Sequence, residues 1–273
     1  MSLTTKKIVM ITGATAGLGR ELALQTAKRG GKTALLARRA ELLETVQREI
    51  KTLGGEALII PTDISDAESV HEAFAEVLDV WPVIDVLFNN AGVIEPIAPL
   101  TECSDEALRN LFMINIFGTY VVAREALKIM RGQENGGVII NISSGAAYKP
   151  YPGWSAYGGS KAAVDQMTRT VAIENKDRPV NIFAIAPGVF ASPMQQKIRG
   201  TPMERFPRLQ RFINLHEQGQ LADPADIADA LIQIGLAPWP ALNGRVEDIR
   251  SAEFQRECRE RGIVFPNAIR VNE

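Results

Sequence analysis

The sequence predicts an α/β fold in which a parallel, doubly wound sheet carries helices on both faces. Short apolar runs of four to six residues alternate along the chain with longer amphipathic segments. Most runs are apolar at consecutive positions, as expected for parallel strands that helices cover on both sides. Strand, helix and strand repeated in this way join through right-handed crossovers. No proline-rich or serine-rich linker and no internal repeat interrupts the pattern, so we expect a single domain over residues 1–273.

The predicted elements alternate from the start of the chain onward. The apolar runs expected to form strands cover residues 8–11, 33–36, 57–60, 84–88, 138–142 and 180–185. The segments of helical length between them include residues 20–29, 40–53, 66–79 and 104–130. A long segment at 189–221 precedes the next helix, which should begin at about Pro224. Residues 251–262 are rich in charged side chains and are expected to form a last helix.

Composition excludes several classes of protein. Lys and Arg number 30 and Asp and Glu 32, so no basic excess is present to bind nucleic acid. Two cysteines and two histidines are too few for a disulfide framework or a catalytic metal site. No run approaches the roughly 18 apolar residues of a membrane span, and residues 1–7 lack the apolar core of a signal peptide. We therefore expect a cytoplasmic protein without a metal.

The first predicted strand ends in a glycine-rich turn. Glycines stand at positions 13, 17 and 19 of the segment TGATAGLG, directly before a predicted helix. Such glycines let the backbone turn tightly and approach a pyrophosphate, whose charge then faces the N-terminus of the helix. The spacing differs from the G-x-G-x-x-G fingerprint, and an ordinary tight turn is the alternative. The position between the first strand and the first helix favours a Rossmann-type dinucleotide site.

The end of the second predicted strand indicates which dinucleotide binds. An acidic residue that accepts the ribose hydroxyls of NAD belongs at about Ala37, but Arg38 and Arg39 follow this small residue instead. An arginine fork binds a 2′-phosphate in bidentate fashion. The alternative is a solvated basic pair at the start of a helix. We expect NADP(H) rather than NAD(H).

Several motifs follow one another along the chain: 12–19 (TGATAGLG), 89–92 (NNAG), 115–118 (NIFG), Ser144, 157–161 (YGGSK) and 187–188 (PG). Taken in this order, they resemble the short-chain dehydrogenase/reductase family over about residues 7–240. The resemblance implies a single NADP(H)-binding reductase domain with a small-molecule substrate. It also implies a homodimer or homotetramer, assembled through the long helices after the fourth and fifth strands.

The spacing of the central motif has a chemical reason of its own. Tyr157 and Lys161 lie one helical turn apart and share a face. A free phenol has a pKa of about 10, and bringing it to about 7 takes roughly 4 kcal/mol from adjacent positive charge, which we expect Lys161 to help supply. Ser144 ends the fifth strand, at the edge where such sheets bind ligands, and could orient a carbonyl that Tyr157 protonates. Ser143 is the alternative, because neighbours on a strand face opposite sides.

The resemblance assigns roles to other residues. Lys161 would also hold the nicotinamide ribose, and Asn115 would hold a water that relays protons to it. Asp63 would contact the adenine, and Ser192 stands where the family more often has threonine. The full set of cofactor contacts that we expect is Gly13, Thr15, Ala16, Gly17, Leu18, Gly19, Arg38, Arg39, Asp63, Ile64, Asn90, Ala91, Gly92, Tyr157, Lys161, Pro187, Gly188, Val189 and Ser192.

Two segments are more particular. Residues 152–157 (PGWSAY) and 193–199 (PMQQKIR) resemble the branch that contains sepiapterin reductase and bacterial benzil reductase. These enzymes use NADPH to reduce one carbonyl of a vicinal dicarbonyl. Expected substrate contacts are Ser144, Trp154, Met194 and Asp248, the last matched to an aspartate that anchors the pterin in sepiapterin reductase. Residues 189–221 are expected to form a lid with one or two amphipathic helices, although plain packing on the sheet is an alternative.

The C-terminal tail, at about 251–273, departs from the common family pattern. Many members finish with a strand and a Val-Asp-Gly-Gly run, which is absent here. The tail is expected either to cover the pocket or to pack across a subunit interface. Two functional alternatives stay open. The same machinery could act on an isolated ketone or secondary alcohol such as a hydroxysteroid, or the protein could sense NADP(H) without turnover. The second is disfavoured, because such sensors usually lose the tyrosine or the lysine.

Overall fold

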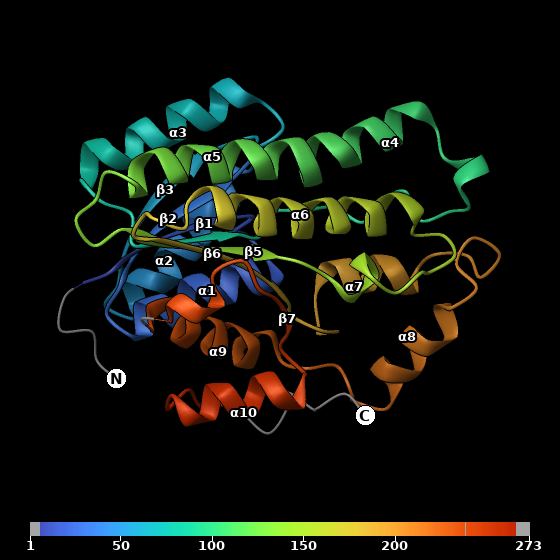
Figure 1. The fold of residues 1–273 in the computed structure, drawn as a ribbon. Helices are drawn as coiled ribbons and strands as arrows, with labels where there is room; N and C mark the ends of the chain where they lie inside the picture. Colours follow the sequence, from blue (N-terminus) through green and yellow to red (C-terminus); the bar gives the residue numbers. More distant parts are fainter. Residues whose placement is uncertain (1–5, 238, 266–273) are drawn as a thin grey trace.

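The computed structural model describes residues 6–237 and 239–265, and it confirms the predicted doubly wound α/β fold (Figure 1). Its strands are parallel and lie in the order β3-β2-β1-β4-β5-β6-β7. They are β1 (Ile8–Thr12), β2 (Lys32–Ala37), β3 (Glu56–Pro61), β4 (Val86–Asn89), β5 (Gly137–Ile142), β6 (Val180–Ala186) and β7 (Val246–Asp248). The order reverses between β1 and β4, which creates the crevice where doubly wound sheets bind ligands.

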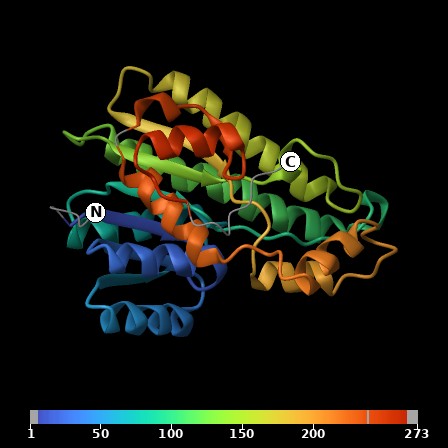
Figure 2. The same ribbon diagram turned by 90° about the horizontal axis from the view of Figure 1, so that it is seen from below.

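Helices cover both faces of this sheet. They are α1 (Gly17–Lys28), α2 (Ala40–Thr52), α3 (Ala67–Val80), α4 (Asp105–Phe112), α5 (Thr119–Met130), α6 (Ser155–Glu174), α7 (Pro193–Arg199), α8 (Leu209–Glu217), α9 (Pro224–Leu236) and α10 (Ala252–Glu260). Figure 1 shows α3, α5 and α6 on one face and α1, α2 and α9 on the other. In Figures 1 and 2, α7 and α8 lie together at one end of the molecule.

The first strand shows why its sequence is apolar at every position. Val9 and Ile11 are fully buried in the core that α1, α2 and α9 share with the sheet. Ile8 and Met10 point to the other face and are buried in the core beneath α3 and α5. Successive side chains of a strand point to opposite faces, so a strand covered on both sides must be apolar throughout. The consecutive apolar runs in the sequence therefore identify the strands correctly.

Two parts of the chain differ from the sequence expectation. Residues 104–130, expected as one helix, comprise α4, a π-helical segment at Met113–Gly118 and α5. The structure also contains a closing strand, β7, that was not among the strands expected from the sequence. The three residues of β7 pair in parallel with β6, with Val246 beside Ala184 and Asp248 beside Ala186. A strand of three residues leaves no periodic signal in the sequence, so only the pairing reveals it.

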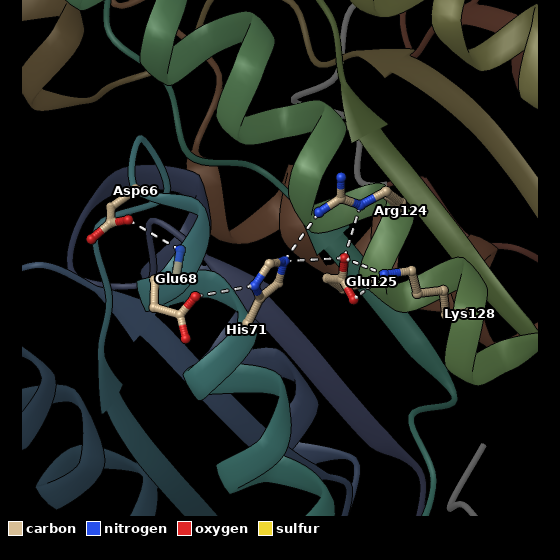
Figure 3. A network of polar contacts seen from close by, with 6 residues as sticks. All are labelled: Asp66, Glu68, His71, Arg124, Glu125 and Lys128. Carbon is tan, nitrogen blue, oxygen red and sulfur yellow. Dashed lines mark hydrogen bonds and ion pairs between the residues drawn. The ribbon is translucent and has the colours of Figure 1, made fainter.

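Helices α3 and α5 are joined by a polar network at their exposed edge (Figure 3). Glu125 of α5 accepts from Arg124 Nε at 2.8 Å and from Lys128 Nζ at 2.9 Å, and its carboxylate lies 3.4 Å from His71 Nε2 of α3. Burial opposes the charge on Glu125, but the two cations hold the pKa of its carboxyl below the usual value. The network thus ties two neighbouring helices together at the surface, outside the cavities described below.

Within residues 6–237 and 239–265, no helix is both long and apolar enough to cross a membrane. The same residues contain no group of three histidine, cysteine or acidic side chains placed to hold a metal ion.

Candidate active site

Two adjoining cavities open at the carboxyl ends of the strands. The first, of about 320 Å³, lies over the glycine turn and the ends of β2, β3 and β4. The second, of about 170 Å³, lies between the ends of β5 and β6, the N-terminal part of α6, and α7. The residues that line both are Asn90, Gly92, Phe190, Ser192 and Met194. A ligand that crosses these shared residues would reach from the glycine turn into the second cavity.

The glycine turn forms a close-fitting cradle at the first cavity. Gly13 and Gly17 have φ angles of +68° and +52°, which favour glycine. A Cβ on Gly19 would collide with the carbonyl oxygen of Gly13 and lie 2.6 Å from Asn90 Nδ2. Asn90 Nδ2 donates to the carbonyl of Thr12 at 2.8 Å, which ties the turn to the end of β4. The backbone at this turn can therefore approach a bound pyrophosphate closely, as a dinucleotide requires.

Most of the residues predicted to bind a cofactor line these cavities. Those around the first cavity are Gly13, Thr15, Ala16, Gly17, Leu18, Arg38, Arg39, Asp63, Ile64, Asn90, Ala91, Gly92 and Ser192. Those around the second include Tyr157, Lys161, Pro187, Gly188 and Val189. Gly19 is not among the described residues that line either cavity, and it lies against the carbonyl of Gly13. Residues that the sequence analysis did not single out, such as Thr62, Phe190 and Ile114, complete the first wall.

Arg38 and Arg39 follow β2 directly, at the rim of the first cavity. Both are exposed, and neither forms an ion pair with any described residue. Ala37 beside them is small and uncharged, so the last residue of β2 carries no carboxylate that would repel a phosphate. The rim therefore presents two unpaired guanidinium groups at the position that distinguishes the two nicotinamide dinucleotides.

Tyr157, Lys161 and Ser144 meet in the second cavity. Tyr157 and Lys161 lie one turn apart on α6, and their side chains are buried, with exposures of 7% and 6%. Lys161 Nζ donates to the carbonyl of Ile142, at the end of β5, at 2.7 Å. The Ser144 hydroxyl accepts from the backbone N–H of Ala146 at 3.2 Å and also hydrogen-bonds with Tyr157. The tyrosine thus has a hydroxyl partner in the cavity and a lysine on its own helix face.

Ser144, rather than Ser143, has the position expected of a substrate-orienting hydroxyl. Both serines line the second cavity. Ser143 is 3% exposed, and its side chain faces Asp165, which lies about two turns beyond Tyr157 on α6. The hydrogen bond with Tyr157 is made by Ser144. The alternation of side chains at the end of β5 separates the two neighbours.

Asn115 lies in the π-helical segment and supports the cavity wall from behind. Its Oδ1 accepts from the backbone N–H of Val93 at 2.8 Å, and its Nδ2 donates to the Val93 carbonyl at 2.8 Å and to Ser160 Oγ at 3.1 Å. A Cβ on Gly92 would lie 3.3 Å from Asn115 Oδ1 and 3.6 Å from Lys161 Nζ. Asn115 and Lys161 therefore approach the same glycine, although Asn115 is not among the described residues that line either cavity.

The ionisation of the two central groups differs from the sequence expectation. Burial raises the pKa of the Tyr157 phenol, and the hydrogen bond with Ser144 only partly opposes this shift. Burial also lowers the pKa of Lys161 from 10.5 to about 8, against the attraction of Asp165. In the protein alone, Lys161 therefore does not bring the tyrosine to a neutral pKa. Desolvation disfavours the charged form of both groups and is the largest cause of each shift.

Asp165 is a buried acid that the sequence analysis did not identify. It stands one turn beyond Lys161 on α6, and its side chain is 5% exposed. Burial raises the pKa of its carboxyl, while Ser143 and Arg169 act in the opposite direction. The spacing of four residues between Tyr157, Lys161 and Asp165 could have revealed it, because such residues share a helix face.

The shifted pKa of Lys161 predicts a pH-dependent stability. Below pH 8 both the folded and the unfolded chain hold the proton, and folding carries the full cost of burying the ammonium. Between pH 8 and 10.5 the folded state loses its proton first, so this cost fades by about 3 kcal/mol. Relative to a Lys161→Met variant, the parent protein should therefore gain stability as the pH rises through this window.

Urea unfolding of both proteins at pH 7 and pH 10 measures this gain. Lys51→Met, at an exposed lysine of α2, is the matched control and should show no comparable change between the two pH values. If the stability difference between the parent and Lys161→Met were the same at both pH values, Lys161 would not be the group whose burial is costly.

Aromatic side chains form the outer wall of the second cavity. The Trp154 ring packs edge-on to Tyr157 at 5.6 Å and stacks on Phe206 at 4.6 Å between centroids. Tyr151 and Phe212 lie within 5.0 Å and 5.3 Å of the same indole. Residues 189–221 contain two helices, α7 and α8, and Phe206 and Phe212 from this segment are buried in this cluster. The segment thus closes one side of the cavity. Met194 and Trp154, two of the predicted substrate contacts, are among the residues that line this cavity.

Asp248 does not occupy the position expected of a substrate anchor. Its carboxylate accepts from Arg250 Nε at 2.9 Å and from Arg250 Nη2 at 2.7 Å, and the Tyr148 hydroxyl donates to it at 3.2 Å. Arg250 lines the second cavity, whereas Asp248 is not among its described lining residues. The chain turns directly after β7, so the arginine comes between the aspartate and the cavity. No periodic or spacing signal in the sequence singled out Arg250.

The described part of the tail packs on the core rather than over the cavities. Helix α10 is exposed on one side and buries Phe254 and Cys258 on the other. Phe254 stacks on Trp239 at 5.9 Å and belongs to the core that includes α9. Residues 266–273 of the tail lie outside the described residues. Residues 252–260 therefore do not cover either cavity, in contrast to one of the two expectations for the tail.

Comparisons with known proteins cover most of this chain. A family model described as short chain dehydrogenase matches residues 7–202. Benzil reductase ((S)-benzoin forming) from Bacillus subtilis (strain 168) is 32% identical over 250 residues, which cover 89% of this chain and 98% of that protein. The 3beta-hydroxysteroid dehydrogenase of Mediterraneibacter gnavus is 31% identical over 192 residues, which cover 70% of this chain and 69% of that protein. The crystal structure of the KRED1-Pglu enzyme has a TM-score of 0.82 and 33% identity, and the match covers 88% of this chain and 100% of that one.

Proposed function

Because the chain belongs to the short-chain dehydrogenase family of oxidoreductases, which use nicotinamide cofactors, we propose that it is an NADP(H)-dependent reductase of small α-dicarbonyl compounds. The observation that carries this proposal is the meeting of Tyr157, Lys161 and Ser144 in one cavity that continues into the glycine cradle. The similarity to a benzil reductase over most of both chains supports a vicinal dicarbonyl as the substrate class.

In the proposed mechanism the protein positions the carbonyl and supplies the proton. Ser144 donates a hydrogen bond to the carbonyl oxygen, and the Tyr157 hydroxyl delivers a proton to the same oxygen as it becomes an alkoxide. Lys161, which is held by the Ile142 carbonyl, stabilises the tyrosinate that forms. When bound, the reduced nicotinamide supplies the hydride to the carbonyl carbon. The buried aromatic wall at Trp154 excludes water from this exchange.

The cofactor would be held mainly by the backbone of the glycine turn. Its pyrophosphate would face the N-terminus of α1 across Gly13 and Gly17, where a Cβ on Gly13 would already touch Ala91 Cα at 2.9 Å. The adenosine would extend toward the end of β2, where Arg38 and Arg39 stand at the rim. The unpaired guanidinium groups are the reason to propose NADP(H).

Arg38→Asp tests this preference. The substitution removes a charge-assisted contact with the 2′-phosphate and places a repelling carboxylate beside it, so the Kd of NADPH should rise about 10- to 100-fold. The Kd of NADH should change by less than about threefold, since NADH has no such phosphate. Fluorescence titration of both dinucleotides gives the two values. Arg48→Asp, a charge reversal on the exposed face of α2, is the control, and an equal loss for NADPH and NADH would contradict the assignment.

Turnover of benzil with NADPH, compared with a monoketone such as a 3-ketosteroid, tests the proposed substrate class. The hydroxysteroid dehydrogenase among the relatives makes an isolated ketone or secondary alcohol the second candidate. We expect benzil to be reduced with the higher kcat/KM. Higher turnover of the monoketone would favour the second candidate. Binding of NADPH without reduction of any carbonyl compound would favour a sensor of cofactor redox state.

A further inference from the structure

The second cavity has a strongly positive lining. Four cationic side chains line it, Lys149, Lys161, Arg211 and Arg250, and no aspartate or glutamate stands among its described lining residues. Lys161 belongs to the proposed proton-transfer machinery, but the other three have no part in it. Cationic side chains that converge on a cavity without carboxylates raise the local concentration of anions.

Arg250 is the cation best placed to touch a substrate. Its side chain is only 21% exposed, and its guanidinium is fixed by two hydrogen bonds from Nε and Nη2 to Asp248. The Cβ position of Gly145, the residue after Ser144, lies 4.0 Å from Arg250 Nη2. The guanidinium therefore stands beside the serine that is proposed to hold the carbonyl.

The hydrogen bonds to Asp248 use one edge of the guanidinium and leave another edge available. A guanidinium carries five N–H bonds in a planar fork, of which Asp248 accepts two. The other three make no hydrogen bond with a described residue. Tyr148 donates to Asp248 from behind at 3.2 Å, so the aspartate is held as a positioning residue for the arginine. A planar fork of this kind is suited to bidentate recognition of a carboxylate.

Lys149 and Arg211 stand farther out, at the exposed rim of the same cavity. Arg211 Nη1 donates to the Tyr151 hydroxyl at 3.4 Å, which places its charge beside the aromatic wall. These two side chains would attract an anion toward the cavity, while the half-buried Arg250 would bind it.

We propose that Arg250 binds an anionic group of the substrate, and that the enzyme selects carbonyl compounds with a carboxylate next to the reacting ketone. The inference rests on the proposed reductase function and narrows its substrate class. An aryl α-keto acid has one group for each part of the cavity. Its ring would pack against Trp154, and its ketone would accept hydrogen bonds from Ser144 and Tyr157. Its carboxylate would bind Arg250. Reduction adds a hydride to the ketone carbon and a proton from Tyr157 to its oxygen, which gives a 2-hydroxy acid.

Benzoylformate and its methyl ester form a matched pair of probes, because they share the ring and the ketone and differ in charge. We expect the parent protein to reduce the acid with a kcat/KM about 10-fold or more above that of the ester. Arg250→Met keeps the aliphatic stem that packs on Gly188 but removes the charge. The variant should lose about 10- to 100-fold in kcat/KM for the acid and change by less than about twofold for the ester.

The ester also serves as the internal measure of folding and of cofactor binding, since both substrates need them equally. Arg208→Met is the matched control, because Arg208 lies over the Tyr151 ring at 5.3 Å and is not among the described lining residues of the cavity. It should leave the ratio of acid to ester unchanged. An equal loss of both substrates in Arg250→Met, or a parent protein that prefers the ester, would overturn the inference.

If the proposed reductase function is wrong, the outcome differs from the one expected if only the inference about Arg250 is wrong. If the protein reduced neither benzoylformate, nor its ester, nor benzil, the reductase proposal would fall, and calorimetric titration would still decide the role of Arg250. Benzoylformate should then bind to the protein in the presence of NADP⁺, and Arg250→Met should bind it about 10-fold more weakly or worse. Equal affinity of the parent and the variant for benzoylformate would overturn the inference in that case as well.

Discussion

Tyr157→Phe is expected to lower kcat for carbonyl reduction by about 10²- to 10⁴-fold, the usual contribution of a positioned general acid. The substitution removes one oxygen and leaves the ring in its place against Trp154, 5.6 Å away and edge-on. In the proposed mechanism the developing alkoxide then has no buried O–H group to protonate it, because the role proposed for Ser144 is to orient the carbonyl. Steady-state kinetics with NADPH and benzil measures the loss.

Two controls separate chemistry from structure in this experiment. The Kd of NADPH should stay within about twofold, because the phenol hydroxyl contributes only a modest hydrogen bond to the cofactor. Tyr151→Phe removes a hydroxyl from the same aromatic wall. Tyr151 transfers no proton in the proposed reaction, so this variant should keep most of the activity. A Tyr157→Phe protein as active as its parent would refute the role of Tyr157 as proton donor.

Gly19→Ala should disrupt both the fold and the cofactor site. The new Cβ would collide with the carbonyl oxygen of Gly13 and would stand 2.6 Å from Asn90 Nδ2, which holds the turn against β4. Backbone cannot yield as a flexible side chain does, so we expect a loss of about 1–3 kcal/mol in the free energy of unfolding, as for other overpacked sites. The displaced turn should also raise the Kd of NADPH at least about 10-fold, because in the proposed site the turn would supply the backbone donors for the pyrophosphate.

Gly159→Ala provides the matched control on another helix. Gly159 is exposed in α6, and a Cβ there would meet nothing within 4 Å. Alanine is the better helix former by about 1 kcal/mol, so this variant should be more stable than the parent. Urea unfolding of both variants measures the change in the free energy of unfolding, and NADPH titration measures the change in Kd. If Gly19→Ala were stabilised like Gly159→Ala, the close contact of the glycine turn with β4 would be absent.

The sequence by itself determined the fold class, the positions of six of the seven strands and the spacing of Tyr157 and Lys161, on which the proposed function rests. Parallel strands covered on both sides need consecutive apolar residues, and such runs are visible without a structure. Tyr157 and Lys161 were identified by resemblance to the family motif, and their spacing of four residues on one helix is a local relation that the sequence shows directly. The glycines of the first turn stood out because only glycine suits a positive φ, such as the +68° of Gly13.

The tertiary structure decided what depends on residues that are distant in the chain. Burial raises the pKa of Tyr157 and lowers that of Lys161, and burial is a property of the packed molecule rather than of a spacing. Asp248 and Arg250 are two residues apart, yet only the turn after β7 determines that the arginine faces the cavity and that the aspartate stands behind it. Local patterns reveal helices, strands and turns, whereas the direction of a side chain after a short edge strand depends on the neighbours that pack against it.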